Sequence, residues 1–222
     1  MAKIYIIDVN FNLSEREINK IKKNVNINLN YKNNQTCVSW GLLLLALKIN
    51  SGDLNLNFDK NIYGKPHIKN SKIFFNISHS YNKAVVAIAN QEVGIDVEKI
   101  KTHNFNISNK YFNECERDYI FLNNSEEEIK KRFCILWTLK ESYLKFKGIG
   151  ISNLRNVKFN LHQNEEGKIK FYVNNEPDCI LKIYSINDLN NEDYIMAYCG
   201  LSDSVELINI EKNTLINFLN NI

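Results

Sequence analysis

The residues of this chain best suited to chemistry begin with a pair of acids, Asp96 and Glu98, in the segment Gly94–Glu98. Residues two apart on a β-strand point to the same side, so both carboxylates would face one surface while Ile95 and Val97 are buried behind them. By itself, such an acidic pair is more often the solvated face of an edge strand. A functional interpretation therefore needs further charged groups nearby.

A second segment supplies such groups on a predicted helix. Trp137, Glu141 and Lys145 recur four residues apart, which aligns an apolar anchor, a carboxylate and an ammonium on one helix face. Glu141 and Lys145 alone would be an ordinary surface ion pair. Docked beside the strand, the helix would gather the carboxylates of Asp96, Glu98 and Glu141. Such acids repel one another unless a hard cation binds, and Mg²⁺ with a phosphate-bearing substrate is the usual resolution.

Polar segments upstream can join these acids. Residues 73–77 predict a short strand, and Ser78-His79-Ser80 is expected to be the polar loop that ends it. An apolar run at residues 84–89 leads through a turn to the acidic strand, so Ser78 and His79 would lie on a strand adjacent to the acids. Alone, a Ser-His pair is more often a hydrogen-bonding loop, and the earlier Gly64-Lys65-Pro66 is turn chemistry.

Together these segments resemble the Sfp-type 4′-phosphopantetheinyl transferases. The family pattern runs G-K-P, F-N-I-S-H-S, V-G-I-D-V-E, an aromatic pair followed by a glutamate, and W-T-x-K-E-S-x-x-K-x-x-G-x-G. This chain presents the blocks in that order and at family-like spacing: Gly64–Pro66, Phe75–Ser80, Val93–Glu98, Tyr111-Phe112 with Glu116, and Trp137–Gly150. Chance does not readily produce such an ordered set, which spans residues 63–151.

The resemblance implies transfer of the 4′-phosphopantetheine arm of coenzyme A to a serine of an apo acyl or peptidyl carrier protein, with release of adenosine 3′,5′-bisphosphate. It also implies that Asp96, Glu98 and Glu141 bind Mg²⁺ at the pyrophosphate. Phosphoryl transfer of this kind depends mainly on positioning and charge neutralisation. Carriers of fatty acid, polyketide and nonribosomal peptide biosynthesis all present such a serine, and the resemblance favours those of secondary metabolism.

The resemblance further assigns roles to single side chains. Glu116 matches the base that activates the carrier serine, although a surface glutamate beside Arg117 is its plainer interpretation. Lys145 matches the residue that engages the pyrophosphate, and Lys140 would assist nearby. Further contacts with the coenzyme are implied for Ser78 and His79 at its phosphates and for Lys65 at its nucleotide end.

One departure concerns the 3′-phosphate of the nucleotide. Members of the family commonly carry arginines just before the helix predicted here at Thr36–Lys48, whereas this chain offers Lys32, Gln35 and Cys37. We therefore expect Lys32 and Lys65 to supply the contact, with weaker affinity for coenzyme A than a fully basic pocket would give.

The order of predicted elements favours an α+β fold. In the first half, a strand at Ile4–Val9, a helix at Ser14–Ile21 with a capping box, and the helix at Thr36–Lys48 precede the strands at residues 73–77, 84–89 and 93–98. The second half repeats helices before strands: helices at Asn109–Leu122 and Glu126–Lys147, then strands at Val157–Leu161, Lys168–Val173, Ile180–Ile186 and Tyr194–Leu201. The resemblance implies two subdomains, residues 1–100 and 101–222, related by pseudo-two-fold symmetry. Each would have a small antiparallel sheet with helices, and the active site would lie at their junction.

Composition agrees with a globular enzyme. Of 222 residues, 44% are hydrophobic, which suffices for a proper core, and the net charge of +3 is far from that of a dedicated nucleic-acid binder. The five cysteines are scattered without zinc-site spacing, which favours reduced thiols and a cytoplasmic location. The longest apolar run, Trp40–Leu47, is too short to span a bilayer and predicts a buried helix. The resemblance favours a monomer.

Two alternatives belong to other classes. A non-catalytic module that keeps the fold and binds a carrier protein would have no physical need to hold three mutually repelling acids. Another nucleotide-dependent phosphotransferase would be expected to carry a phosphate-binding loop, and no G-x-x-x-x-G-K-[ST] occurs in the sequence.

Overall fold

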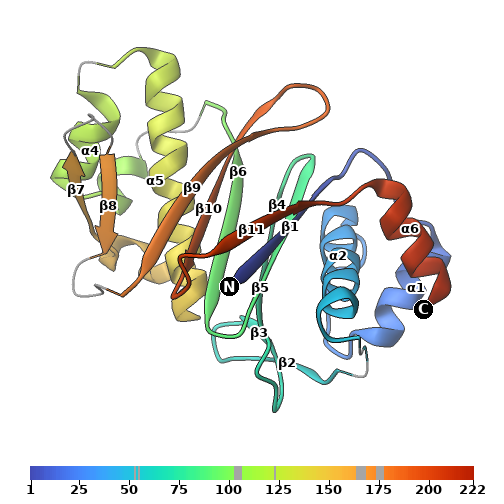
Figure 1. Cartoon of the computed structure of the whole chain (residues 1–222). Helices are drawn as coiled ribbons and strands as arrows, with labels where there is room; N and C mark the ends of the chain where they lie inside the picture. The colour runs from blue at the N-terminus through green and yellow to red at the C-terminus, as the bar shows by residue number, and fades with distance from the viewer. Residues whose placement is uncertain (53, 55, 103–106, 123, 164–168, 174–177) are drawn as a thin grey trace.

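A computed structural model describes residues 1–52, 54, 56–102, 107–122, 124–163, 169–173 and 178–222. Two sheets lie at its centre, a four-stranded sheet in the order β11-β1-β5-β4 and a three-stranded sheet in the order β6-β10-β9. Figure 1 shows helices on both outer sides, with α1, α2 and α6 beside the first sheet and α4 and α5 beside the second. The predicted α+β class, with small and mainly antiparallel sheets, is confirmed.

The strands of the two central sheets are short and regular. The first sheet contains β1 (Ala2–Asp8), β4 (Phe74–Ser80), β5 (Lys83–Ala89) and β11 (Val205–Asn209). The second contains β6 (Val93–Lys99), β9 (Ile180–Asn187) and β10 (Asp193–Gly200). Apolar side chains of β1 and β5 form one buried cluster with those of β6 and β10, so the two sheets pack against each other.

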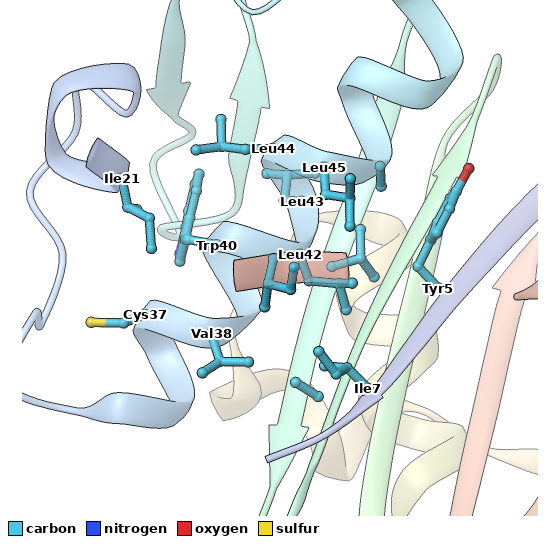
Figure 2. Packing of buried hydrophobic residues seen from close by; sticks show 14 of the residues in the cluster. Tyr5, Ile7, Ile21, Cys37, Val38, Trp40, Leu42, Leu43, Leu44 and Leu45 are labelled. Atoms are coloured by element: carbon cyan, nitrogen blue, oxygen red, sulfur yellow. The ribbon is translucent and has the colours of Figure 1, made fainter. Parts of the chain in front are cut away.

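The helices beside the first sheet cover one core. Helix α1 (Glu15–Asn24) begins at Ser14 with the predicted capping box, in which Glu17 is the partner. Helix α2 (Asn34–Ser51) is apolar on every side because α1, α6 (Lys212–Asn221) and the sheet surround it. Figure 2 shows Leu42 of this helix on the side of Tyr5 and Ile7, with Trp40 on the other side of the helix within the same cluster.

The helices beside the second sheet are α3 (Ser108–Tyr111), α4 (Glu114–Phe121) and α5 (Glu126–Lys147). Helix α5 has the predicted bounds and ends at Gly148, whose φ of 66° is left-handed and suits glycine. It lies so close to β6 that a Cβ on Gly94 would stand 2.0 Å from the carbonyl oxygen of Ser142. Glycine at position 94 therefore lets α5 pack directly against β6.

Several elements differ from the sequence-based expectations. Ser78-His79-Ser80 does not form a loop, because the three residues continue β4 and pair with β5 as far as Lys83. The single helix expected at Asn109–Leu122 is divided into α3 and α4, since Asn113 has extended backbone and caps α4. The strand expected at Val157–Leu161 is β7 (Phe159–Gln163), and Lys168, the first residue expected in β8 (Ile169–Val173), lies outside the described residues.

Some elements of the structure lie outside those predicted from the sequence. They are the short strands β2 (Phe58–Lys60) and β3 (Pro66–Ile68), the 3-10 helix η2 (Ile151–Asn156), strand β11 and helix α6. Elements from one side of the proposed division at residue 100 also pair or pack with elements from the other side. Strand β6 pairs with β10 of the second sheet, while β11 pairs in parallel with β1 and α6 joins the core around α2. Within the described ranges, no helix has the length and apolar character needed to span a membrane.

Candidate active site

The acidic residues lie where the edges of the two sheets meet. Strands β4 and β6 are edge strands of different sheets, and polar side chains from β4 bridge the gap between them. Ser78 Oγ donates to Asp96 Oδ1 over 2.7 Å, and Ser80 Oγ donates to Glu98 Oε2 over 2.8 Å. One step earlier, Asn76 Oδ1 accepts from the backbone N–H of Ile95. Every second residue of β4 therefore holds the acidic strand in place.

Helix α5 brings a cation to this seam. Lys145 Nζ lies 2.6 Å from Asp96 Oδ1 and donates to Ser78 Oγ over 2.9 Å. Asp96 is 1% exposed, and within the described residues its other oxygen, Oδ2, is buried without a hydrogen-bond partner. Burial opposes the charge of Lys145, but the carboxylates of Asp96, Glu141 and Glu98 outweigh it and raise the pKa of its ammonium.

Glu141 lies one helical turn before Lys145 and completes the acidic group. Burial and the charge of Asp96 raise its pKa to about 7, against the influence of Lys145 and of a hydrogen bond with the Trp137 side chain. Burial and Asp96 likewise raise the pKa of Glu98. The carboxylates of Asp96, Glu98 and Glu141 thus lie close enough to one another and to the Lys145 ammonium to influence its pKa and those of Glu98 and Glu141. The hydrogen bond with Trp137 helps to hold Glu141 in position.

Two adjoining cavities open at this group. One, of about 360 Å³, extends from the three carboxylates past His79 and Thr36 to Lys60. The other, of about 260 Å³, is more apolar and is lined by residues including Tyr63, Leu144, Ile149 and Ile151. Glu141 and Lys145 line both cavities, so the charged group stands at their common boundary.

The residues expected to contact the coenzyme are placed unevenly. His79 lines the larger cavity with Nε2 3.5 Å from Thr36 Oγ1, and burial together with Lys145 lowers its pKa. Lys65 lines the smaller cavity, but its ammonium is paired with Glu92 at 2.6 Å and also donates to two backbone carbonyls. Lys32 is exposed just before α2 and does not line either cavity.

Glu116 and Lys140 form a separate, fully buried ion pair. Both side chains are 0% exposed, with Lys140 Nζ 2.9 Å from Glu116 Oε2. Glu116 also accepts from the backbone N–H groups of Asn113 and Phe159, and Lys140 donates to the carbonyls of Tyr111 and Val157. Neither residue lines the two cavities. The pair joins α4, α5 and the start of β7, and burial lowers the pKa of Lys140.

Two polar residues of the site, Ser80 and Lys60, are not among those predicted from the sequence. The sequence predicts a loop at Ser80. However, Asn76, Ser78 and Ser80 are each two residues apart, which is the spacing of one face of a strand and could have identified Ser80 as part of the site. Lys60 lines the larger cavity from β2 and donates to the carbonyl of Asn28 over 2.9 Å. A three-residue strand carries too little pattern to reveal such a position.

The donor set fits a hard divalent cation, although no three His, Cys, Asp or Glu side chains among the described residues already stand in a metal-binding arrangement. The ammonium of Lys145 lies against Asp96 Oδ1, while Asp96 Oδ2 is buried and has no hydrogen-bond partner in the described part of the chain. Burial, followed by the charge of Asp96, raises the pKa values of Glu98 and Glu141, and a cation bound among these carboxylates would oppose both effects. All the donors are oxygens, which suits Mg²⁺.

The chain is similar in sequence to known 4′-phosphopantetheinyl transferases. The model of the 4′-phosphopantetheinyl transferase superfamily matches residues 92–199, which include both acidic segments. The chain is 35% identical to the 4′-phosphopantetheinyl transferase gsp of Aneurinibacillus migulanus over 74% of this chain and 66% of that protein. It is 32% identical to the 4′-phosphopantetheinyl transferase Sfp of Bacillus subtilis over 66% of this chain and 63% of that protein.

These matches span slightly less than two thirds of those relatives' lengths. The 4′-phosphopantetheinyl transferase psf-1 of Bacillus pumilus is 30% identical over 72% of this chain and 67% of its own length. The acids on β6 and the glutamate and lysine on α5 all lie within residues 92–199, the range matched by the superfamily model. The chain belongs to the 4′-phosphopantetheinyl transferase superfamily.

Proposed function

We propose that this protein transfers the 4′-phosphopantetheine arm of coenzyme A to the serine hydroxyl of an apo acyl or peptidyl carrier protein. The observation that carries the proposal is the placement of Lys145 between Asp96 and Ser78, with Glu141 beside it, at the boundary of two cavities. An ammonium beside a set of carboxylates suits a pyrophosphate that arrives together with a cation.

Asp96, Glu98 and Glu141 would hold Mg²⁺, which supplies neutralisation of charge on phosphate oxygens when it is bound. Ser78 and Ser80 fix the orientation of the first two carboxylates through their hydroxyl groups. Such fixed ligands avoid reorganisation during the reaction. Lys145 can release one of its contacts to meet a pyrophosphate oxygen, while His79 and Lys60 line the cavity into which the nucleotide would extend.

In the proposed reaction, the serine oxygen forms a bond to the β-phosphorus of coenzyme A. The bond from that phosphorus to the bridging oxygen breaks, and adenosine 3′,5′-bisphosphate leaves with the electron pair. Lys145 is positioned to neutralise the charge that develops on the phosphate oxygens. Serine attack also requires a group that accepts the hydroxyl proton.

We assign that proton to a carboxylate oxygen of Glu141 that does not hold Mg²⁺, because Glu141 lines both cavities. Glu116, the base implied by family resemblance, is 0% exposed and bonded on both oxygens, so a carrier serine would have to open its ion pair with Lys140. The proposal therefore gives Glu116 and Lys140 the role of fixing α4 to α5.

We propose a monomer that works in the cytoplasm without nucleic acid or membrane partners and that serves carriers of secondary metabolism. The relatives named above are transferases of the same arm, which supports coenzyme A and a carrier protein as the partners.

The test is intact-mass spectrometry of a panel of apo carrier proteins after incubation with this protein, coenzyme A and Mg²⁺. We expect each accepted carrier to gain the mass of one phosphopantetheine group. Glu141→Ala should abolish the gain, whereas Glu127→Ala, which removes an exposed carboxylate from the same helix, should leave it intact. Binding of coenzyme A without a mass gain on any carrier would instead support the non-catalytic binding module.

A further inference from the structure

Two cysteines that the proposed reaction does not use lie in contact. The Sγ atoms of Cys179 and Cys199 are 2.9 Å apart, and the two residues are not joined by a disulfide. Cys199 is buried within β10, while Cys179 is half-buried and immediately precedes β9. Cys179 is therefore the more accessible residue of the pair.

The other cysteines have different surroundings. Cys37 and Cys134 are buried, and their thiols lie 3.3 Å and 3.7 Å from the backbone carbonyl oxygens of Tyr31 and Glu98. Cys115 is exposed on α4. Within the described residues, Cys179 and Cys199 are the only two thiols placed side by side.

The pair also has a defined place in the fold. In the ladder between β10 and β6, Cys199 is opposite Gly94 and Ala197 is opposite Asp96. Residues directly opposite each other in a sheet share a face, so Cys199 lies on the sheet face that carries Asp96 and packs against α5. A covalent link from Cys199 to Cys179 would tie the start of β9 to the end of β10 beneath that helix.

We propose that Cys179 and Cys199 form a reversible oxidation site that reacts with small peroxides. The thiolate of Cys179 attacks one peroxide oxygen and breaks the O–O bond, which yields a sulfenic acid and, with hydrogen peroxide, one water. The sulfur of Cys199 then attacks the sulfenic sulfur, forms the disulfide and expels the second water. In total, two thiols lose two electrons and two protons while one hydrogen peroxide is reduced to two waters.

Little movement is needed for the second step. A disulfide bond is about 2.05 Å long, so the two sulfur atoms must approach by less than about 1 Å from their separation of 2.9 Å. Because Cys199 is buried next to the site of attack, it captures the sulfenic acid before a second peroxide can oxidise it further.

The experiment uses the full chain with Cys115→Ser, which removes the exposed thiol. The reduced protein is treated with hydrogen peroxide, its remaining thiols are blocked with N-ethylmaleimide, and it is digested without reductant. We expect one cross-linked peptide pair that contains Cys179 and Cys199. Before blocking, the intact mass of the oxidised protein should be lower by two hydrogens than that of the reduced protein, and dithiothreitol should reverse both changes. The oxidised protein should also melt several degrees higher than the reduced protein, because the disulfide lowers the conformational entropy of the unfolded chain.

Cys179→Ser in the same background is the matched control, since its half-buried position should tolerate the change. It should lose the cross-link and the shift in melting temperature while it keeps the melting temperature of the reduced protein. The proposal is overturned if peroxide adds oxygen atoms to Cys179 without a cross-link, if Cys179 couples to Cys37 or Cys134, or if the thiols remain fully reactive to N-ethylmaleimide.

Discussion

Asp96 and Glu141 illustrate how single residues balance charge at this site. Asp96 Oδ1 accepts hydrogen bonds from both Ser78 Oγ and Lys145 Nζ. Glu98 and Glu141 therefore share the ammonium of Lys145 with Asp96. Glu141 bears the consequence, because burial and the charge of Asp96 raise its pKa from 4.5 to about 7. Ionising Glu141 near neutral pH therefore works against the folded state.

The raised pKa of Glu141 predicts how Glu141→Gln changes the free energy of unfolding with pH. A carboxyl whose pKa is higher in the folded than in the unfolded protein stabilises folding at low pH, and that contribution is lost as pH rises from about 4.5 through 7. We expect the variant to gain stability relative to the natural protein between pH 5 and pH 8, by up to about 3 kcal/mol. Urea unfolding at a series of pH values without metal measures it.

Added Mg²⁺ should reverse that ranking at pH 8, because the natural protein then gains stability through a full carboxylate set and Glu141→Gln gains less. A stability difference between the two proteins that does not vary with pH would show that Glu141 ionises normally.

Lys60 provides a second prediction at this scale. It lines the larger cavity, whereas Lys32 does not and the ammonium of Lys65 is already paired. We therefore expect Lys60 to meet the 3′-phosphate of coenzyme A. Hydrogen bonds to charged groups contribute about 1.5–3 kcal/mol, so Lys60→Met should weaken coenzyme A binding about tenfold or more.

Titration calorimetry with coenzyme A and dephospho-coenzyme A separates this role from a general loss of binding. Lys60→Met should bring the two affinities together, while Lys32→Met should preserve their ratio. The opposite pattern would return the contact to Lys32, as the sequence suggested.

At the scale of elements, the site depends on how closely α5 approaches β6. Gly94 permits that contact, since a Cβ there would stand 2.0 Å from Ser142 O and 2.4 Å from the backbone N of Phe146. These are backbone atoms, so neither can rotate away. The helix that carries Glu141 and Lys145 can therefore reach Asp96 only over a residue without a side chain.

Gly94→Ala should accordingly force the helix outward and cost about 1–3 kcal/mol or more. Gly150→Ala is the matched control, because a Cβ there meets nothing closer than 3.7 Å and the φ of −72° is ordinary. Urea denaturation compares the two variants. Equal stability of both would mean that α5 can shift without cost.

At the scale of the whole molecule, the C-terminal segment completes the N-terminal core. Strand β11 pairs with β1, and Leu215 and Leu219 of α6 are 0% exposed. Two leucine side chains near the end of the chain thus belong to the cluster built around α2. The stability of the first sheet and its helices therefore depends on residues far away in the sequence.

We expect Leu219→Ala to cost about 2–5 kcal/mol, the usual range for a buried leucine that leaves a cavity. Leu201→Ala, at a position that is 42% exposed, should cost far less. Thermal unfolding of both variants would measure the difference. A negligible effect of Leu219→Ala would show that α6 detaches without affecting the core.

Local patterns determined much of this protein in advance. The two-residue spacing of Asp96 and Glu98 and the four-residue spacing of Glu141 and Lys145 were enough to predict a strand face and a helix face, whereas the meeting of the two was implied by the family resemblance. The bounds of α5 and the cap at Ser14 were also predicted, because helix periodicity and capping act within a few residues.

Only the tertiary structure decided which polar residues stay accessible. Glu116 matched a family motif by its spacing, but packing places it in a buried pair with Lys140, and Lys60 enters the cavity from a strand too short to predict. The parallel pairing of β11 with β1 and the contact of Cys179 with Cys199 likewise join residues distant in sequence. Burial and strand pairing depend on the packing of the entire chain, which no short sequence pattern contains.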